Sequence, residues 1–206
     1  FSYNKNLDQQ RAHLELLKHG DPNGKYWVPA MADAPLRGYN GRHEWFWEPG
    51  DENAVYPLEN LVNMYYNSVG RNATLILGLT PDPRGLIPEG DVQRLKEFGD
   101  KISELVAHPI QSISGTGNSI ELKLDKPQPV NQIILQEDIT KGERIRDYHV
   151  EGLTPHGWKT LCHGESVGHK RIQTFSPVTV GKIRFVINKQ VDIPQIINFS
   201  VYNIDQ

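Results

Sequence analysis

Residues 73–79 read ATLILGL, a continuous apolar run with the length of one β-strand. A strand that is apolar on both faces is typical of the buried strands of a parallel sheet. The loop at 80–90 that follows is rich in proline and glycine. Apolar side chains then recur every three or four residues from Val92 to Leu105, which predicts a helix capped at its start by Asp91. Strand, loop and helix in this order are typical of an α/β structure with parallel strands.

The chain before this run contains too few strands to close a sheet. An amphipathic helix is expected over Leu58–Val69, closed by Gly70, and another over Leu7–Lys18. The run Tyr26–Pro29 is short, and its proline limits it to the end of a strand. Two strands with flanking helices cannot bury both faces of a sheet. We therefore expect an N-terminal part outside this sequence to complete the first domain.

After residue 110 the hydrophobic period changes to two. Short alternating runs follow one another at intervals of roughly ten residues, with Gly, Pro and Asn between them, a pattern typical of an antiparallel β-sandwich. The polar segments Lys141–Arg144 and Gly168–Arg171 are expected at strand ends, as solvated loops or, alternatively, as part of a ligand site. The sequence thus predicts an α/β unit over residues 1–110 and a β-sandwich over residues 111–206. The alternating runs are Ile120–Leu124, Ile133–Gln136, Tyr148–Glu151, Arg171–Phe175, Lys182–Ile187 and Ile196–Tyr202.

Composition excludes several classes of protein. The 206 residues include 22 Lys and Arg against 25 Asp and Glu, a net charge of -3, which argues against binding to nucleic acid or to an acidic membrane surface. With 37% hydrophobic and 23% charged residues the chain is too apolar to be disordered. No apolar run is long enough for membrane insertion. The single Cys162 excludes an intramolecular disulfide, and the scattered histidines show no metal-ligand spacing, so we expect no metal and no cofactor.

The densest group of chemically active side chains lies in residues 26–52, where aromatic rings alternate with carboxylates and arginines. Rings stack on the C–H face of a sugar while charged groups bind its hydroxyls, so this composition favours a sugar site; a surface loop pinned by its aromatic residues is the alternative. Glu44 stands among rings that would desolvate it and raise its pKa, as a general acid requires. Glu48, at the far edge of the same rings, is the second candidate. Asp33, Asp51 and Glu52 are expected to be turn residues.

Several segments of this sequence resemble the α-L-fucosidases of glycoside hydrolase family 29, in the right order over nearly the whole chain. In the first part these are Tyr26–Pro29, Pro35–Arg37, Trp45–Trp47, Leu61–Tyr66, Ser68–Leu75 and Thr80–Leu86. In the second part they are Leu135–Ile139, Gly142, Arg144 and Gly168–Ile172. The resemblance implies the C-terminal end of a catalytic (β/α)8 barrel, followed by a jelly-roll β-sandwich related to discoidin-like and carbohydrate-binding modules.

The resemblance also implies retaining hydrolysis of terminal α-L-fucose by a nucleophile and an acid/base residue about 5 Å apart. The family's nucleophile is an Asp on an earlier barrel strand that nothing here matches, so we expect it outside this chain and expect the chain alone to be inactive. Where many members carry Pro-x-Glu, this chain has Pro29-Ala30-Met31, and Met31 cannot donate a proton. We therefore assign the acid/base role to Glu44, with Glu48 second.

The substrate-binding candidates are Trp45, Trp47, Arg37 and His43. Trp45 and Trp47 would wall the sugar pocket, and Arg37 would bind a hydroxyl or instead hold the loop through Asp33. The expected partners are a fucosylated glycan and an N-terminal barrel fragment. The expected location is secreted or periplasmic, with any signal peptide outside a sequence that opens at Phe1. The alternatives are a non-catalytic carbohydrate-binding or structural β-sandwich fragment, and a barrel glycosidase of another specificity.

Overall fold

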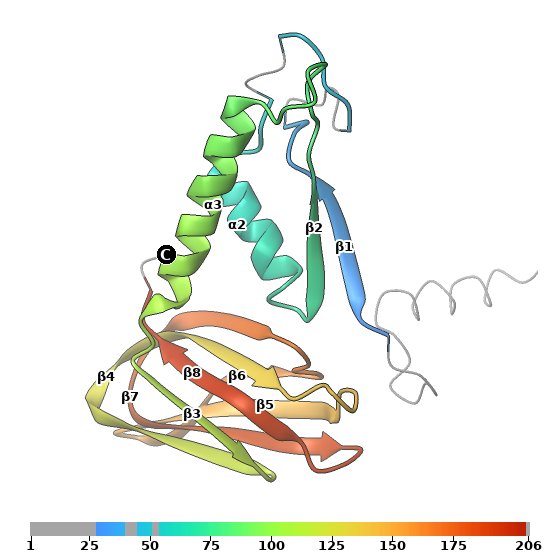
Figure 1. Ribbon diagram of the computed structural model, residues 1–206. Helices are drawn as coiled ribbons and strands as arrows, with labels where there is room; N and C mark the ends of the chain where they lie inside the picture. Colours follow the sequence, from blue (N-terminus) through green and yellow to red (C-terminus); the bar gives the residue numbers. More distant parts are fainter. Residues whose placement is uncertain (1–27, 40–44, 51–53, 205–206) are drawn as a thin grey trace, which may run out of the picture.

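The computed structural model describes residues 28–39, 45–50 and 54–204 (Figure 1). The first part consists of strand β1 (Ala30–Pro35), helix α2 (Leu58–Asn67), strand β2 (Ala73–Gly78) and helix α3 (Glu89–Ala107). Periodicity predicts both helices and the continuous apolar run predicts β2, whereas β1 begins just after the run Tyr26–Pro29, for which the sequence predicts only a strand end. The helix expected over Leu7–Lys18 lies outside the described residues.

β1 and β2 pair in parallel, in a register that runs from Ala30 opposite Ala73 to Pro35 opposite Gly78. Helices α2 and α3 lie next to each other beside this pair (Figure 1). The expectation that β2 is buried on both faces is wrong for this chain, since Ile76 remains 42% exposed. The reason is that the described residues supply only these two strands to the sheet, so one face has no cover and no closed barrel forms among them.

The second part is a six-stranded antiparallel sheet with the order β3-β8-β4-β7-β5-β6. The sheet curls into two layers that enclose one apolar core, which makes the β-sandwich (Figure 1). Within the described ranges, none of the helices is long and apolar enough to cross a membrane. The strands are β3 (Gln111–Thr116), β4 (Ser119–Glu137), β5 (Ile145–Thr154), β6 (Gly157–Gly164), β7 (Arg171–Gln190) and β8 (Gln195–Tyr202).

Two of these strands are much longer than the sequence pattern suggests. The alternating runs at 120–124 and 133–136 are both part of β4, and those at 171–175 and 182–187 are both part of β7. The register between β4 and β7 shifts between Lys123 and Gln128 and again between Val130 and Gln132. Such irregularities bend a strand, so one strand contributes to both layers of the sandwich. The core between the layers therefore takes residues from both halves of β4 and β7.

The sandwich also packs against the helices of the first part. Residues 130–135 of β4 are all buried, because Ile133 and Leu135 face the sandwich core while Ile134 joins a second apolar cluster with Tyr65 and Tyr66 of α2. The Tyr66 hydroxyl donates a hydrogen bond to Gln132 Oε1 at 2.6 Å. The two parts of the chain are thus joined by an apolar cluster and by a hydrogen bond next to it.

A tight turn between α2 and β2 completes this junction. Asn72 has a φ of +69°, a left-handed conformation that Asn tolerates better than most residues. Its Oδ1 accepts a hydrogen bond from the backbone N–H of His169 at 2.6 Å, and its Nδ2 donates to Glu143 Oε1. A Cβ at Gly168 would clash with the Asn72 side chain, so the close approach of these two loops requires glycine there.

Candidate active site

The carboxyl ends of β1 and β2 lead into a loop that contains most of the expected site residues. We call residues 36–56 the aromatic loop. Its first limb continues the sheet, because the Leu36 N–H donates to Gly78 O at 3.0 Å. Its two limbs then pair with each other: the Tyr56 N–H donates to Leu36 O at 3.0 Å, and the Gly38 N–H donates to Ala54 O at 2.9 Å. The loop therefore leaves and re-enters the fold at one fixed base beside the strand ends.

A buried ion pair ties this base to helix α3. Arg37 is 2% exposed and Asp91 is fully buried. Arg37 Nε donates to Asp91 Oδ2 at 3.0 Å, and its Nη2 donates to Oδ1 at 2.5 Å, a bidentate arrangement. The prediction that Asp91 caps the helix is wrong: α3 begins at Glu89, Pro88 flanks it, and the Asp91 carboxylate is directed to Arg37 instead.

Trp45 lies against the end of β2. A Cβ on Gly78 would come within 2.7 Å of Trp45 Cζ3, so the indole rests on the strand backbone where only glycine leaves room for it. The same ring is 47% exposed, which leaves part of its surface accessible at the carboxyl edge of the parallel pair. Trp47 and Glu48 are partly buried in the same segment. The aromatic loop thus places the Trp45 indole at the end of β2, and Glu48, one of the two acid/base candidates, follows three residues later.

Two of the expected site residues, His43 and Glu44, lie outside the described residues, as do Asp51 and Glu52. Asp33 is described and is exposed on β1. Neither Asp91 nor Arg94 was among the candidates from sequence, although both contact the aromatic loop. The signal was weak, because a charged residue in the first turns of an amphipathic helix usually faces solvent. The described residues contain no cluster of three His, Cys, Asp or Glu side chains suited to a metal ion.

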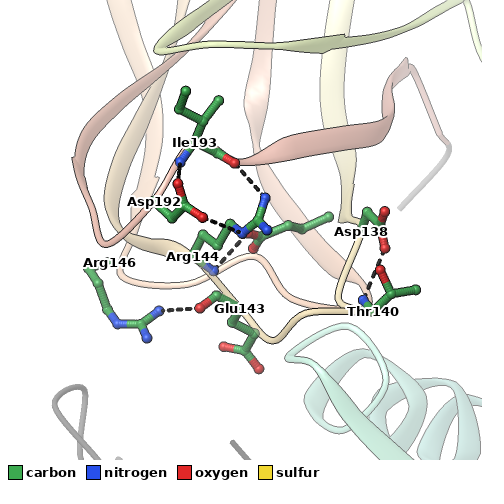
Figure 2. Close-up of polar contacts among 8 residues, drawn as sticks. Asp138, Thr140, Glu143, Arg144, Arg146, Asp192 and Ile193 are labelled. Atoms are coloured by element: carbon green, nitrogen blue, oxygen red, sulfur yellow. Dashed lines mark hydrogen bonds and ion pairs between the residues drawn. The ribbon is translucent and has the colours of Figure 1, made fainter.

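The sandwich has its own polar cluster at the end that faces the α2–β2 turn (Figure 2). Arg144 binds the loop before β8, through Ile193 O at 2.6 Å and the Asp192 carboxylate at 3.6 Å. Its backbone N–H donates to Glu137 Oε1 at 2.8 Å, and burial raises the pKa of the Glu137 carboxyl above its usual range. These contacts link the end of β4, the segment before β5 and the loop before β8. We interpret the polar cluster as a structural tie between loops.

Other chemically active groups of the sandwich are occupied or buried. The Arg184 guanidinium stacks over the Trp158 ring at 4.1 Å and pairs with Glu151 through Nε at 2.5 Å. Burial raises the pKa of the Cys162 thiol to about 12, so this thiol is a poor nucleophile. The only tryptophan of residues 111–206 is therefore covered on one face by a paired arginine.

Comparison with known proteins agrees with this geometry. A solved structure from Bacteroides thetaiotaomicron, provisionally named an α-L-fucosidase, matches 94% of this chain at 60% sequence identity with a TM-score of 0.90. Alpha-L-fucosidase 1 of Arabidopsis thaliana is 28% identical over 222 residues, covering 90% of this chain. A Ruminococcus gnavus GH29 fucosidase, solved in complex with fucose, matches 91% of the chain at 25% identity with a TM-score of 0.77. The resemblance to glycoside hydrolase family 29 is confirmed.

These three relatives are considerably longer than the chain. It spans 45% of the Bacteroides structure, 42% of the Arabidopsis enzyme and 43% of the Ruminococcus structure. No protein-family model matches it. The chain therefore corresponds to less than half of a family 29 α-L-fucosidase, and its antiparallel part matches the β-sandwich of those enzymes.

Proposed function

We propose that this chain is the C-terminal portion of a retaining α-L-fucosidase that removes terminal α-L-fucose from glycans. The observation that carries the proposal is the 60% identity over 94% of the chain to a protein provisionally named as such an enzyme. The position of the aromatic loop supports it, because the loop lies beyond the carboxyl ends of two parallel strands. In (β/α)8 barrels the active site is built at that face of the sheet.

In this proposal, β1, α2, β2 and α3 are the last strands and helices of the barrel, over residues 1–110, and an N-terminal part of the enzyme supplies the rest. The exposed apolar surface of the parallel pair supports this assignment. Met31 on β1 is 68% exposed and Ile76 on β2 is 42% exposed. Apolar side chains at these positions are what neighbouring barrel strands and helices would cover.

The chemistry assigned to this chain is that of the acid/base residue. Glu44, or Glu48 in its place, protonates the glycosidic oxygen as the bond to fucose breaks and then takes a proton from the attacking water. The nucleophile, an Asp of the N-terminal part, forms the covalent glycosyl intermediate. Trp45 and Trp47 wall the pocket against the apolar side of the sugar, and His43 is assigned to substrate binding. Arg37 belongs to the support of the loop, because its guanidinium is buried against Asp91.

The sandwich, over residues 111–206, is assigned a bracing role. Its His169 N–H binds Asn72 of the α2–β2 turn, and its Gln132 and Ile134 contact helix α2. A glycan-binding role is less favoured, because Arg184 covers one face of Trp158. A secreted or periplasmic location is part of the proposal, and cell fractionation of the producing organism tests it.

Hydrolysis of an aryl α-L-fucoside tests the function, with the matching galactoside as the specificity control. The chain alone is expected to be inactive, and the complete enzyme, or the chain recombined with its N-terminal part, is expected to be active. In the complete enzyme, Glu44→Gln is expected to slow poorly activated fucosides sharply, and azide is expected to restore turnover of an activated one. Unchanged rates would transfer the role to Glu48, and turnover of the galactoside alone would refute the assignment to fucose.

A further inference from the structure

Helix α3 contacts both limbs of the aromatic loop from a single face. Asp91 holds the first limb through the bidentate bond to Arg37. Arg94, three residues later, donates from Nη1 to the backbone carbonyl oxygen of Tyr56 on the returning limb, at 2.5 Å. Residues three apart on a helix lie next to each other on its surface, so the two contacts form one rigid pair. We propose that Asp91 and Arg94 act as positioning residues that fix the two described limbs of the aromatic loop at its base, and with them Trp45 and Glu48, beside the sugar site.

The chemistry of the first contact favours positioning over simple stability. Two fully buried charges lose their hydration, so a buried ion pair is a weak source of stability compared with well-packed apolar side chains. What a bidentate guanidinium–carboxylate pair does supply is a fixed orientation. Here the orientation is imposed on Arg37 at the point where its own backbone pairs with Val55 across the base of the loop. Fixing that side chain fixes the pairing of the two limbs.

The second contact acts on the other end of the same loop. Arg94 is itself held in place by Glu97, through Nε at 2.8 Å, so its Nη1 is directed to Tyr56 O with little freedom. The Tyr56 ring packs edge-on against Tyr39 of the first limb, with ring centroids 5.8 Å apart. Movement of either limb along α3 would break these contacts together. The helix and the loop base therefore behave as one unit, and Trp45 of the same loop lies against Gly78 at the end of β2.

The inference rests on the proposed function, and it predicts a kinetic effect in addition to the loss of stability that follows from leaving Arg37 buried without the Asp91 carboxylate. Misplacing a catalytic group by about 1 Å can cost on the order of 100-fold in rate. In the complete enzyme we expect Asp91→Asn to lower kcat/KM for an aryl α-L-fucoside by about 10–100-fold, and Arg94→Gln, which removes one contact, by about 3–10-fold. Both variants should also shift the alkaline limb of the kcat pH profile, because the surroundings of the acid/base residue change.

The control is Lys96→Gln, which removes a charge from the same helix. Lys96 pairs with Asp100 at 2.6 Å on the exposed face of the helix. A double-mutant cycle of Asp91→Asn with Arg94→Gln should be non-additive, because both residues act on one loop. Losses in the control equal to those in the two variants, or additive losses without a shift in the pH profile, would overturn the proposal. If Asp91→Asn does not fold, Arg94→Gln alone carries the test.

A second readout separates failure of this inference from failure of the proposed function. The chain labelled with 5-fluorotryptophan reports the surroundings of Trp45 and Trp47 without any substrate. We expect the ¹⁹F resonances of these two residues to shift in both variants, while that of Trp158 in the sandwich stays in place. If the wild-type enzyme hydrolyses no fucoside, these shifts still support the role of Asp91 and Arg94 in fixing the aromatic loop. If the resonances do not move, that role is refuted, whatever the activity.

Discussion

Adding one methyl group at Gly78 tests whether Trp45 lines the proposed sugar pocket. An Ala Cβ there would lie 2.7 Å from Trp45 Cζ3 and 3.1 Å from Cε3, whereas ordinary contacts begin at 3.4 Å. The ring must therefore move by about 0.7 Å, the difference between 3.4 and 2.7 Å. The backbone itself accepts alanine, because Gly78 is not among the glycines with positive φ. Gly78→Ala is thus a displacement of Trp45 with little other change.

The effect on stability should be small and the effect on activity large. Overpacking costs about 1–3 kcal/mol, and the low end applies here because the indole is half exposed and can retreat. Replacing glycine by alanine recovers about 0.4–1 kcal/mol through the unfolded chain. The free energy of unfolding should therefore change by less than about 1 kcal/mol, while kcat/KM of the complete enzyme for an aryl α-L-fucoside should fall by about 10-fold.

The matched control for this substitution is Gly99→Ala in α3, where an added Cβ meets nothing within 4 Å. It should stabilise the helix by about 0.5–1 kcal/mol and leave kinetics unchanged. Urea denaturation and steady-state kinetics on both variants decide the matter. If Gly78→Ala keeps the kcat/KM of the control, Trp45 does not wall the sugar pocket. If it costs more than about 3 kcal/mol, the ring is locked in place and the reasoning from its exposure is wrong.

Three further predictions concern the sandwich and its junction with the helices. Asn72→Ala should lower the free energy of unfolding by about 1–3 kcal/mol, because the His169 N–H loses its acceptor and alanine disfavours φ of +69°; urea denaturation beside Asn72→Gly, which also removes the side chain but accepts this φ, checks it. Because burial raises the pKa of Glu137 in the folded state, that state binds more protons than the unfolded one, and stability falls as pH rises through the folded pKa. Glu137→Gln should therefore stabilise the chain at pH 7 and lose this advantage below about pH 4.5, as thermal melts across pH will show; an equal gain at all pH values contradicts the assignment. With its pKa raised to about 12, Cys162 should react with iodoacetamide at pH 8 roughly 1,000-fold more slowly in the folded chain than in urea, and equal rates would refute its burial.

The sequence predicts best those elements that bury one face and leave the other exposed. Helix α2 and strand β2 appear where periodicity and apolar content indicate them, and the alternation at 120–124 holds because one face of β4 there is solvent-exposed. The alternation expected over Ile133–Gln136 fails, because Ile133, Ile134 and Leu135 belong to a segment, 130–135, that is buried throughout. One face of that segment meets the sandwich core and the other meets α2, and a single strand's pattern cannot show that a second partner is present. The same limit applies to β2. Its apolar run predicts a strand covered on both faces, but the described residues pair it only with β1 and leave Ile76 exposed.

The candidate site shows a related division between chemistry and support. The aromatic and acidic residues that would contact a sugar are close together in sequence, so composition alone draws attention to residues 26–52. The residues that hold them are not: Asp91 lies 54 positions after Arg37, and Arg94 lies 38 positions after Tyr56. Both appear in the sequence as ordinary charged residues at the start of an amphipathic helix. Only the tertiary structure shows that their side chains bind the aromatic loop. If the double-mutant cycle shows coupling between Asp91 and Arg94, helix α3 is part of the catalytic apparatus, and the precision of the site depends on a helix that does not touch the substrate.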